Sequence, residues 1–390
     1  MPRICFRYAA VLLVAAWTSA AVAHDPGDPL LDVAGGTTIE PRARMVDVAR
    51  ELLASTRGGP TAAEIVGRYS RELLLLHPAE SPDKRDWMYW PAQRIGLPLN
   101  LMSAEQMTLT QELLWSLVSD YGYAKLLNIM QLENILFWTT GPGYPRGLGN
   151  YVLVFFGEPS ATEPWSWRFE GHHISLSVSV TPDGVSLTPS FLGANPSNYQ
   201  TSPLTGVRTL RLLEDLGKTL VNSMSAEQRV VANVQGDPAF NALSASFGIK
   251  TFEDAPFDLY GARFLLPEAN WEDWKDIPIS GIAGSGLTDT QKMLLARLFD
   301  QVLKVYRKQH VEKYQMEVDD LHFAFIGDPS PDGMIYYRIQ GGDFFYEFGN
   351  TAAERYHVHS VWHDRKDDYG ADLLRRHYEL QHGDEARPAE

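Results

Sequence analysis

Cysteine is nearly absent from this sequence: Cys5 is the single one among 390 residues. It lies in an N-terminal segment with the features of a signal peptide, so the chain that remains after cleavage has no thiol. That chain has no disulfide, no cysteine nucleophile and no thiolate ligand for a metal. It must be stabilised by an ordinary core, which its 44% of hydrophobic residues can supply.

Long hydrophobic runs are also missing. The apolar stretch 8–17 is shorter than the roughly 20 residues that cross a bilayer. Arg3 and Arg7 precede it, and Ala21-Val22-Ala23 follows with small residues at the spacing that signal peptidase accepts. We expect residues 1–23 to be removed by cleavage near Ala23 and the protein to be exported, either to the periplasm or as a secreted protein. Residues 24–40 would then be an exposed lead-in and 383–390 a flexible tail.

Positive charge is scarce. The chain has 34 Lys and Arg against 49 Asp and Glu, a net charge of −15. Without Arg3 and Arg7 the basic total is 34 − 2 = 32, and the net charge becomes −17. Such a surface repels phosphate backbones, so we expect no nucleic-acid partner, and with no second apolar run we expect no membrane span. A small-molecule, peptide-like or sugar-like ligand stays open, and the sequence does not indicate an oligomeric state.

Several catalytic signatures are missing as well. The sequence has no G-x-S-x-G nucleophile elbow, no H-E-x-x-H zinc motif and no P-loop. A Ser-His-Asp triad stays open only because these residue types are plentiful. No motif of a familiar enzyme class therefore identifies the activity.

Apolar spacing predicts where the helices lie, over 42–76, 103–134, 210–221, 226–234 and 371–380. Ser103 and Gln106 form a capping-box pattern at the start of the second of these. Period-two alternation from His173 to Val180 predicts a strand.

The chain also resembles itself at an offset of 170 residues. Residues 155–171 (FFGEPSATEPWSWRFEG) and 325–341 (FIGDPSPDGMIYYRIQG) share 6 of 17 positions without a gap. Each segment reads as strand, Gly-acid-Pro turn, strand and glycine turn. We therefore predict an α+β protein of two related halves, each made of helices plus an antiparallel β-meander. The repeats would lie at about 103–180 and 285–360, inside one domain spanning 41–382.

Histidine is unevenly distributed. Five of the 11 histidines lie between residues 357 and 382, and His172 and His173 are adjacent. The second repeat has Gly342 and Asp343 in place of this pair, so the scaffold does not require the two histidines, which favours a functional role. On a strand they would point to opposite faces, and only one would enter a given pocket. The alternative is a structural histidine paired with a carboxylate such as Glu170.

His357-Val358-His359 is the sharper signal. Alternate residues of a strand project to the same side, so both imidazoles can bind one metal. In the absence of cysteine we expect zinc or iron. A third ligand would come from His172, His173, Glu347 or His363. Side chains that orient the ligand imidazoles are expected among His363, Asp364, Asp372 and His377.

Two carboxylates and one arginine complete the predicted site. Glu170 and Glu347 are expected to move protons. Arg168, which repeats as Arg338, is expected to pair with Glu170 or to grip a substrate carboxylate.

Two long strings resemble one family. WRFEGHHISLSVSV and HVHSVWHDRKDDYGADLLRRHYELQH are similar to the uncharacterised bacterial family called domain of unknown function 3500, over roughly 42–382. The resemblance implies no activity. The chain departs from the family pattern at 348–352 and at His363, where arginine is usual. The residues that the resemblance implies to act together are Arg168, Glu170, Gly171, His172, His173, His357, His359, Trp362, Asp364, Gly370, Asp372, His377 and Tyr378.

These observations predict an exported, metal-dependent enzyme, a hydrolase or an oxidoreductase. Histidines from the two halves would converge where the ends of the sheet meet, and the metal would activate water or polarise a carbonyl. The alternative is a non-catalytic small-ligand-binding protein or a structural envelope protein with structural histidines.

Overall fold

The structure is a computed structural model of the chain. It describes residues 30–31, 38–56, 75–89, 91–140, 146–200, 205–234, 275, 278–350 and 356–382. The expected signal peptide at 1–23, the expected tail at 383–390 and the helical pattern over 57–74 lie outside these residues. Within the expected lead-in, β1 (Leu30–Leu31) pairs with β2 (Thr38–Ile39).

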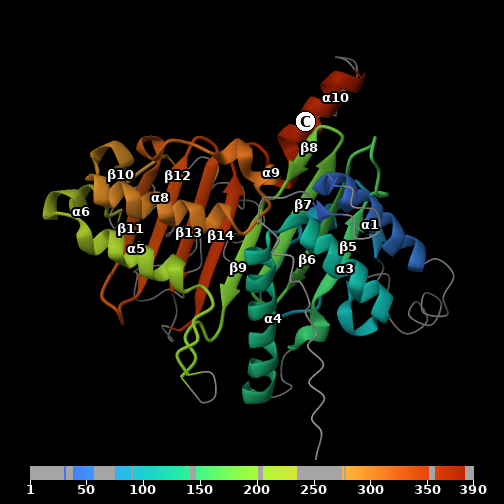
Figure 1. Ribbon diagram of the computed structural model, residues 1–390, viewed down its shortest axis with the longest axis horizontal. Coiled ribbons are helices and arrows are strands. Elements are labelled where there is room, and N and C mark those ends of the chain that lie inside the picture. Colours follow the sequence, from blue (N-terminus) through green and yellow to red (C-terminus); the bar gives the residue numbers. More distant parts are fainter. Residues whose placement is uncertain are drawn as a thin grey trace, which may run out of the picture.

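Twelve strands of the described chain form one sheet, in the order β10-β11-β12-β13-β14-β9-β7-β6-β5-β3 (Figure 1). β4 also pairs with β5, and β8 with β7. The pairing is antiparallel except between β3 and β5. The strands are β3 (Leu76–His77), β4 (Leu97–Pro98), β5 (Val152–Phe156), β6 (Trp165–Gly171), β7 (Ile174–Thr181), β8 (Gly184–Ser186), β9 (Ser190–Ala194), β10 (Ile282–Ala283), β11 (His322–Gly327), β12 (Ile335–Gly341), β13 (Phe344–Asn350) and β14 (Val358–Asp364).

α1, α3, α4, α5 and α8 lie on one face of this sheet (Figure 1). α1 packs against α3 and α5 against α8, while α4 contacts β9 near the middle of the sheet. The α+β class is therefore confirmed. The helices are α1 (Pro41–Thr56), α3 (Ala104–Leu117), α4 (Asp120–Thr140), α5 (Arg211–Ser223), α6 (Ala226–Ala232), α8 (Asp289–Leu303), α9 (Lys308–Val311) and α10 (Ala371–His382).

Helix boundaries follow local capping chemistry. Ser103 and Gln106 form the predicted capping box at the start of α3, and Thr288 and Gln291 form an equivalent one at the start of α8. The predictions at 210–221, 226–234 and 371–380 are confirmed as α5, α6 and α10. Among the described helices, none is long and apolar enough to cross a membrane.

β6 shows how the two faces of the sheet differ. Trp167 faces the helices, and its Nε1 donates to Met45 Sδ of α1. Arg168 points to the other face, where its Nη1 donates to the backbone oxygen of Asp83, 2.8 Å away. Because the segment around Asp83 covers that face, all seven residues of β6 are buried.

The two β-meanders join edge to edge. β5-β6-β7 and β11-β12-β13 belong to one continuous sheet because β9 pairs with β14, with Ala194 opposite Val358 and Gly193 opposite His359. β9 also pairs with β7, where Leu192 lies opposite Ile174. This junction brings the first residues of β14 next to the turn between β6 and β7.

Candidate metal centre

Three imidazoles converge at the junction of β7, β9 and β14. His173 comes from the turn before β7, His357 directly precedes β14, and His359 lies within it. The Nε2 atom of His357 lies 2.8 Å from Nε2 of His173 and 2.9 Å from Nε2 of His359. The structure thus brings together residues from the two histidine groups that the sequence singled out.

Gly193 makes this convergence possible. It pairs with His359 across β9 and β14, and its backbone N–H donates to the backbone oxygen of His173, 2.8 Å away. A Cβ on Gly193 would lie 2.7 Å from Cδ2 of His173 and 3.1 Å from Cδ2 of His359. The two rings therefore occupy the space that any side chain at this position would fill.

The predicted strand position of His172 and His173 is wrong. Gly171 pairs with Ile174, so the two histidines form the two-residue turn between β6 and β7. Their rings stack with centroids 3.7 Å apart instead of pointing to opposite faces. His173 has a φ of 67°, a left-handed conformation that is costly for a residue with a Cβ.

Backbone contacts hold this turn in place. The His173 N–H donates to the backbone oxygen of Tyr89 at 2.8 Å, and the Tyr151 hydroxyl donates to the backbone oxygen of His172 at 2.7 Å. These contacts from two other segments offset the strain at His173 and fix the direction of its imidazole.

The three imidazoles lie in a largely buried, aromatic environment. His173 and His359 are buried, and the rings of Tyr89 and Phe191 lie 5.3 Å and 5.2 Å from the ring of His359. Burial, reinforced by His359, lowers the pKa of His357 to about 2. Burial and the neighbouring histidines also lower the pKa of His173 well below its ordinary value. His173 and His357 are thus neutral near pH 7, the form in which imidazole binds metals.

The geometry suits a cation better than it suits hydrogen bonds. A neutral imidazole has one N–H and one lone pair, so Nε2 of His357 can make only one directed hydrogen bond. It nevertheless has two nitrogen neighbours within 2.9 Å. A tetrahedral ion with bonds of about 2.0–2.1 Å holds its ligand nitrogens about 3.3–3.4 Å apart. A small outward movement of the rings would therefore admit an ion.

A second group of potential ligands adjoins the first. His172 Nδ1 contacts Glu133 Oε1 of α4, and these two residues with His173 also have ligand atoms within 4.8 Å of one another. Arg146 already lies beside this group, with its Nη1 3.2 Å from His172 Nδ1 and 3.6 Å from Glu133 Oε1. The guanidinium of Arg146 already neutralises the negative charge of Glu133, which a metal ion would otherwise neutralise. The group of three histidines is therefore the better candidate for a metal site.

Glu133 and Arg146 were missed by the sequence analysis. Glu133 is 2% exposed, on a helix where Ile129 and Leu136 on the same face are also buried. A lone carboxylate on an apolar helix face is unusual without a partner, so that signal indicates that Glu133 has a partner but not that the partner is a histidine of the centre. Arg146 carries no comparable pattern.

Glu170 and Arg168 lie close in sequence to the histidines of the centre, but they form an ion pair with each other. Arg168 Nε is 3.0 Å from Glu170 Oε1, and both side chains are buried. Glu170 Oε2 accepts hydrogen bonds from the Met88 N–H and the Ser175 hydroxyl. The expected pairing of Arg168 with Glu170 is thus present, and Glu170 is absent from both groups of potential ligands in the described chain.

Glu347 lies deeper in the sheet. It is fully buried on β13, accepts a hydrogen bond from the Tyr336 hydroxyl and stands opposite Arg338 of β12. It too is absent from both groups within the described residues, so the structure does not bring it to the histidines.

The side chains expected to orient the imidazoles lie towards the other end of β14. His363 is four residues beyond His359, a distance of about 13 Å along a strand. The Nδ1 atom of His363 lies 2.5 Å from Oδ2 of Asp368. Asp364 accepts a hydrogen bond from the Tyr314 hydroxyl. Asp372 forms ion pairs with Arg375 and Arg376. His377 Nδ1 lies 3.6 Å from Oδ2 of Asp183. None of the four belongs to the ligand groups found in the described part of the chain.

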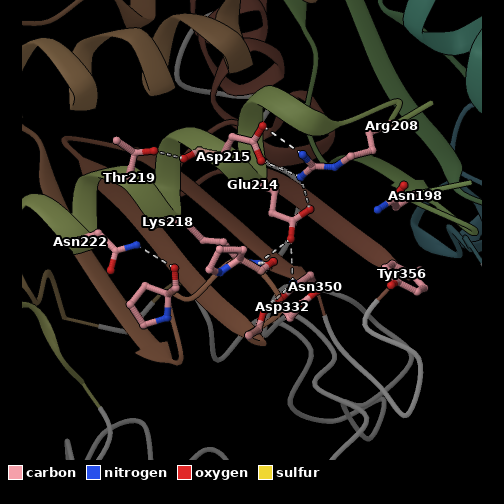
Figure 2. A pocket seen from close by; sticks show the side chains of 13 residues that line it. Asn198, Arg208, Glu214, Asp215, Lys218, Thr219, Asn222, Asp332, Asn350 and Tyr356 are labelled. Atoms are coloured by element: carbon pink, nitrogen blue, oxygen red, sulfur yellow. Dashed lines mark hydrogen bonds and ion pairs between the residues drawn. The ribbon is translucent and has the colours of Figure 1, made fainter. Parts of the chain in front are cut away.

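A polar cavity of about 400 Å³ lies beside α5 (Figure 2). Glu214 is its central acid: Arg208 Nη2 and Lys218 Nζ each lie 2.8 Å from one of its oxygens, and Asn350 Nδ2 donates to it at 3.0 Å. Asn350 belongs to the segment 348–352 that departs from the family pattern. These charges neutralise one another and tie α5 to the end of β13, a structural use.

Fold and site together define an α+β protein with a histidine-rich candidate metal centre. The chain belongs to the family described as "Protein of unknown function (DUF3500)", whose profile matches residues 62–371. This match confirms the family resemblance and covers the histidines and acids discussed above except Asp372 and His377. Neither a curated protein nor a solved structure matches the chain.

Proposed function

We propose that the chain is a metal-dependent enzyme whose zinc or iron ion is bound by His173, His357 and His359. The observation that carries this proposal is the convergence of three Nε2 atoms from segments 184 residues apart in the chain. Three protein ligands leave coordination positions for water or substrate, as in catalytic rather than structural zinc sites.

A hydrolytic reaction fits the surrounding residues better than a redox reaction. A bound zinc ion lowers the pKa of its water to about 7 or polarises a carbonyl. His172 stacks on the proposed ligand His173 and contacts Glu133. An imidazole oriented by a carboxylate is a common proton acceptor for an attacking nucleophile. Glu133 thus takes the role that the sequence analysis gave to Glu170 or Glu347.

Elemental analysis of the protein after chelation and reloading with zinc or iron(II) tests the proposal. We expect about one tightly bound ion per chain and a loss of more than about 100-fold in affinity in His357→Ala and in His359→Ala. His322→Ala is the control, because His322 lies on β11 in the other part of the sheet. Wild-type protein that takes up neither metal, or a control variant that loses metal equally, contradicts the proposal.

A non-catalytic ligand-binding protein is the second candidate. The burial of His173 and His359, and the packing of the Tyr89 and Phe191 rings against His359, favour it, because such packing also suits histidines that only stabilise the sheet. Turnover of ester, peptide and glycoside probes by metal-loaded protein separates the two. Turnover that disappears in His357→Ala supports the enzyme.

We also propose that the two meanders arose by duplication of a unit corresponding to about 103–180 and 285–360. β6 and β12 lie at the sequence offset of 170 and have equal lengths, and each ends in a two-residue turn. Gly157 and Gly327, at the same offset, both have positive φ, Gly157 directly after β5 and Gly327 as the last residue of β11. The proposal rests on these parallels and on the repeated strings.

Export remains a proposal that rests on the N-terminal sequence. Sequencing of the N-terminus of protein recovered from the periplasm or the medium tests it, with His24 expected as the first residue. Recovery of the protein only from the cytoplasm with Met1 or Pro2 intact would contradict it.

A further inference from the structure

Two of the residues around the proposed metal are partly exposed. His173, His359, Glu133 and His172 are buried, whereas His357 and Arg146 are partly exposed. Arg146 is close enough to His357 for its charge to contribute to lowering the pKa of that histidine. Arg146 and His357 are thus the partly exposed members of this set of residues.

Arg146 is held in position by the end of α4 and the loop that follows it. Asn150 Nδ2 donates to the backbone oxygen of Arg146 at 2.5 Å, and the Leu148 N–H donates to Asn134 Oδ1 of α4 at 3.3 Å. The Arg146 side chain is 11% exposed, and its contacts with Glu133 and His172 are both made through Nη1. The guanidinium, which has five N–H donors, is thus fixed at the rim of the centre.

Three arginines and two glutamates interact around the centre, in a chain with a net charge of −15. Arg94 is also buried. Burial lowers the pKa of its guanidinium, and the negative charges of Glu170 and Glu133 offset part of that lowering. Arg94, Arg146 and Arg168 oppose Glu133 and Glu170, which leaves a surplus of one positive charge. A divalent ion on three neutral imidazoles adds two more. Such a site in a buried setting attracts an anion and disfavours a cation.

We propose that the substrate is a small molecule with a carboxylate group, an inference that rests on the proposed function. The metal and the guanidinium of Arg146 would both bind this carboxylate. A planar guanidinium matches a planar carboxylate through parallel N–H donors. The net charge of an occupied centre would fall towards neutrality when one carboxylate binds.

Cobalt(II)-loaded protein provides the test, because cobalt(II) absorbs visible light and reports on ligands of the metal. Acetate is the probe, acetamide its neutral isostere and inorganic phosphate the tetrahedral anion. We expect acetate to change the cobalt spectrum with at least about tenfold higher affinity than acetamide or phosphate. Arg146→Gln should retain cobalt and lose about tenfold or more in acetate affinity, and Arg146→Lys should lose less. Arg211→Gln, on the exposed side of α5, is the control and should bind acetate as the wild type does.

The outcomes separate this proposal from the metal centre itself. Wild-type protein that takes up no cobalt(II) overturns both. Normal cobalt uptake with acetate affinity unchanged in Arg146→Gln and Arg146→Lys overturns the carboxylate proposal alone, as does tighter binding of phosphate or of acetamide. If Arg146→Gln takes up no cobalt because it does not fold, the comparison of Arg146→Lys with the wild type decides the question.

Discussion

His173 and His357 stand 184 residues apart in the chain, and their Nε2 atoms lie 2.8 Å apart. Two strand pairings produce this contact, β7 with β9 and β9 with β14. A shift of one residue in either pairing would turn the imidazoles away from each other, because neighbouring residues of a strand point to opposite faces. The candidate centre therefore depends on the register at the middle of the sheet.

Gly193 is the most sensitive point of this register. In Gly193→Ala the new Cβ would lie 2.7 Å from Cδ2 of His173 and 2.9 Å from the backbone oxygen of Val358. We expect the variant to lose about 1–3 kcal/mol of unfolding free energy and to bind zinc at least about tenfold more weakly, since both rings must move. Urea unfolding and competitive zinc titration measure the two effects.

Gly184→Ala is the matched control for this substitution. A Cβ there would meet Leu373 Cδ1 at 3.6 Å, an ordinary van der Waals contact. Equal zinc affinity in Gly193→Ala and Gly184→Ala would show that Gly193 does not make room for the imidazoles.

The left-handed backbone of His173 predicts which of two variants, His173→Gly or His173→Ala, is the more stable. Both variants lack the imidazole that would bind the metal. With a φ of 67°, glycine should be more stable than alanine at this position by about 1 kcal/mol. At His359, in extended backbone within β14, the order should reverse, with alanine more stable by about 0.5–1 kcal/mol. Thermal or urea unfolding of His173→Gly, His173→Ala, His359→Gly and His359→Ala measures this. The same order at both positions would contradict the left-handed turn.

Glu133 is expected to matter for stability even without metal. Glu133→Gln leaves the guanidinium of Arg146, 11% exposed, beside a group that no longer carries charge. We expect a loss of about 3 kcal/mol in unfolding free energy of the metal-free protein. Glu112→Gln breaks a half-exposed pair with Arg44 and should cost about 0–1 kcal/mol. Similar losses in the two variants would indicate that Glu133 is not a buried partner of Arg146.

His310 gives the fold a pH dependence that is separate from the metal centre. Its Nε2 lies 3.0 Å from the backbone oxygen of Ser116, and burial lowers its pKa from 6.5. Below that pH the unfolded chain takes up a proton that the folded chain does not, so the contribution of His310 to stability is present above about pH 6.5 and is lost as the pH falls.

His310→Gln should remove this component. We expect the free energy of unfolding of the wild type to fall with decreasing pH by up to about 1.4 kcal/mol per pH unit more than that of the variant. Urea unfolding of both metal-free proteins at about pH 7.5, 6 and 5 measures the difference. Parallel curves for the two proteins would contradict a neutral, buried His310.

Local sequence signals predicted much of the fold. Apolar spacing and caps identified α3, α5 and α10, and alternation identified β7. The position of His173 was misread because the alternation of 174–180 continues backwards to it without interruption. A turn at His172 and His173 follows only from the pairing of Gly171 with Ile174, which is a contact between strands. A left-handed histidine also has no sequence signature, since the residue expected there is glycine.

The histidines of the candidate centre could be predicted, but their carboxylate and arginine could not. His172 and His173 stood out because the second repeat lacks them, and His357 and His359 stood out by their spacing. Glu133 and Arg146 reach the centre from α4 and from the loop that follows it, through tertiary packing that no local pattern encodes. Glu170 and Glu347 were expected because they are near in sequence or in repeat, yet Glu170 pairs with Arg168 of its own strand and Glu347 with Tyr336 of the neighbouring strand.

X-ray absorption spectroscopy of zinc-loaded protein tests the central claim most directly, because it counts the imidazoles bound to the ion. The account predicts about three imidazole nitrogens at about 2.0–2.1 Å with one or more further oxygen ligands, and one imidazole fewer in His173→Gly. A first shell of oxygens alone, or three imidazoles that persist unchanged in His173→Gly, would contradict it.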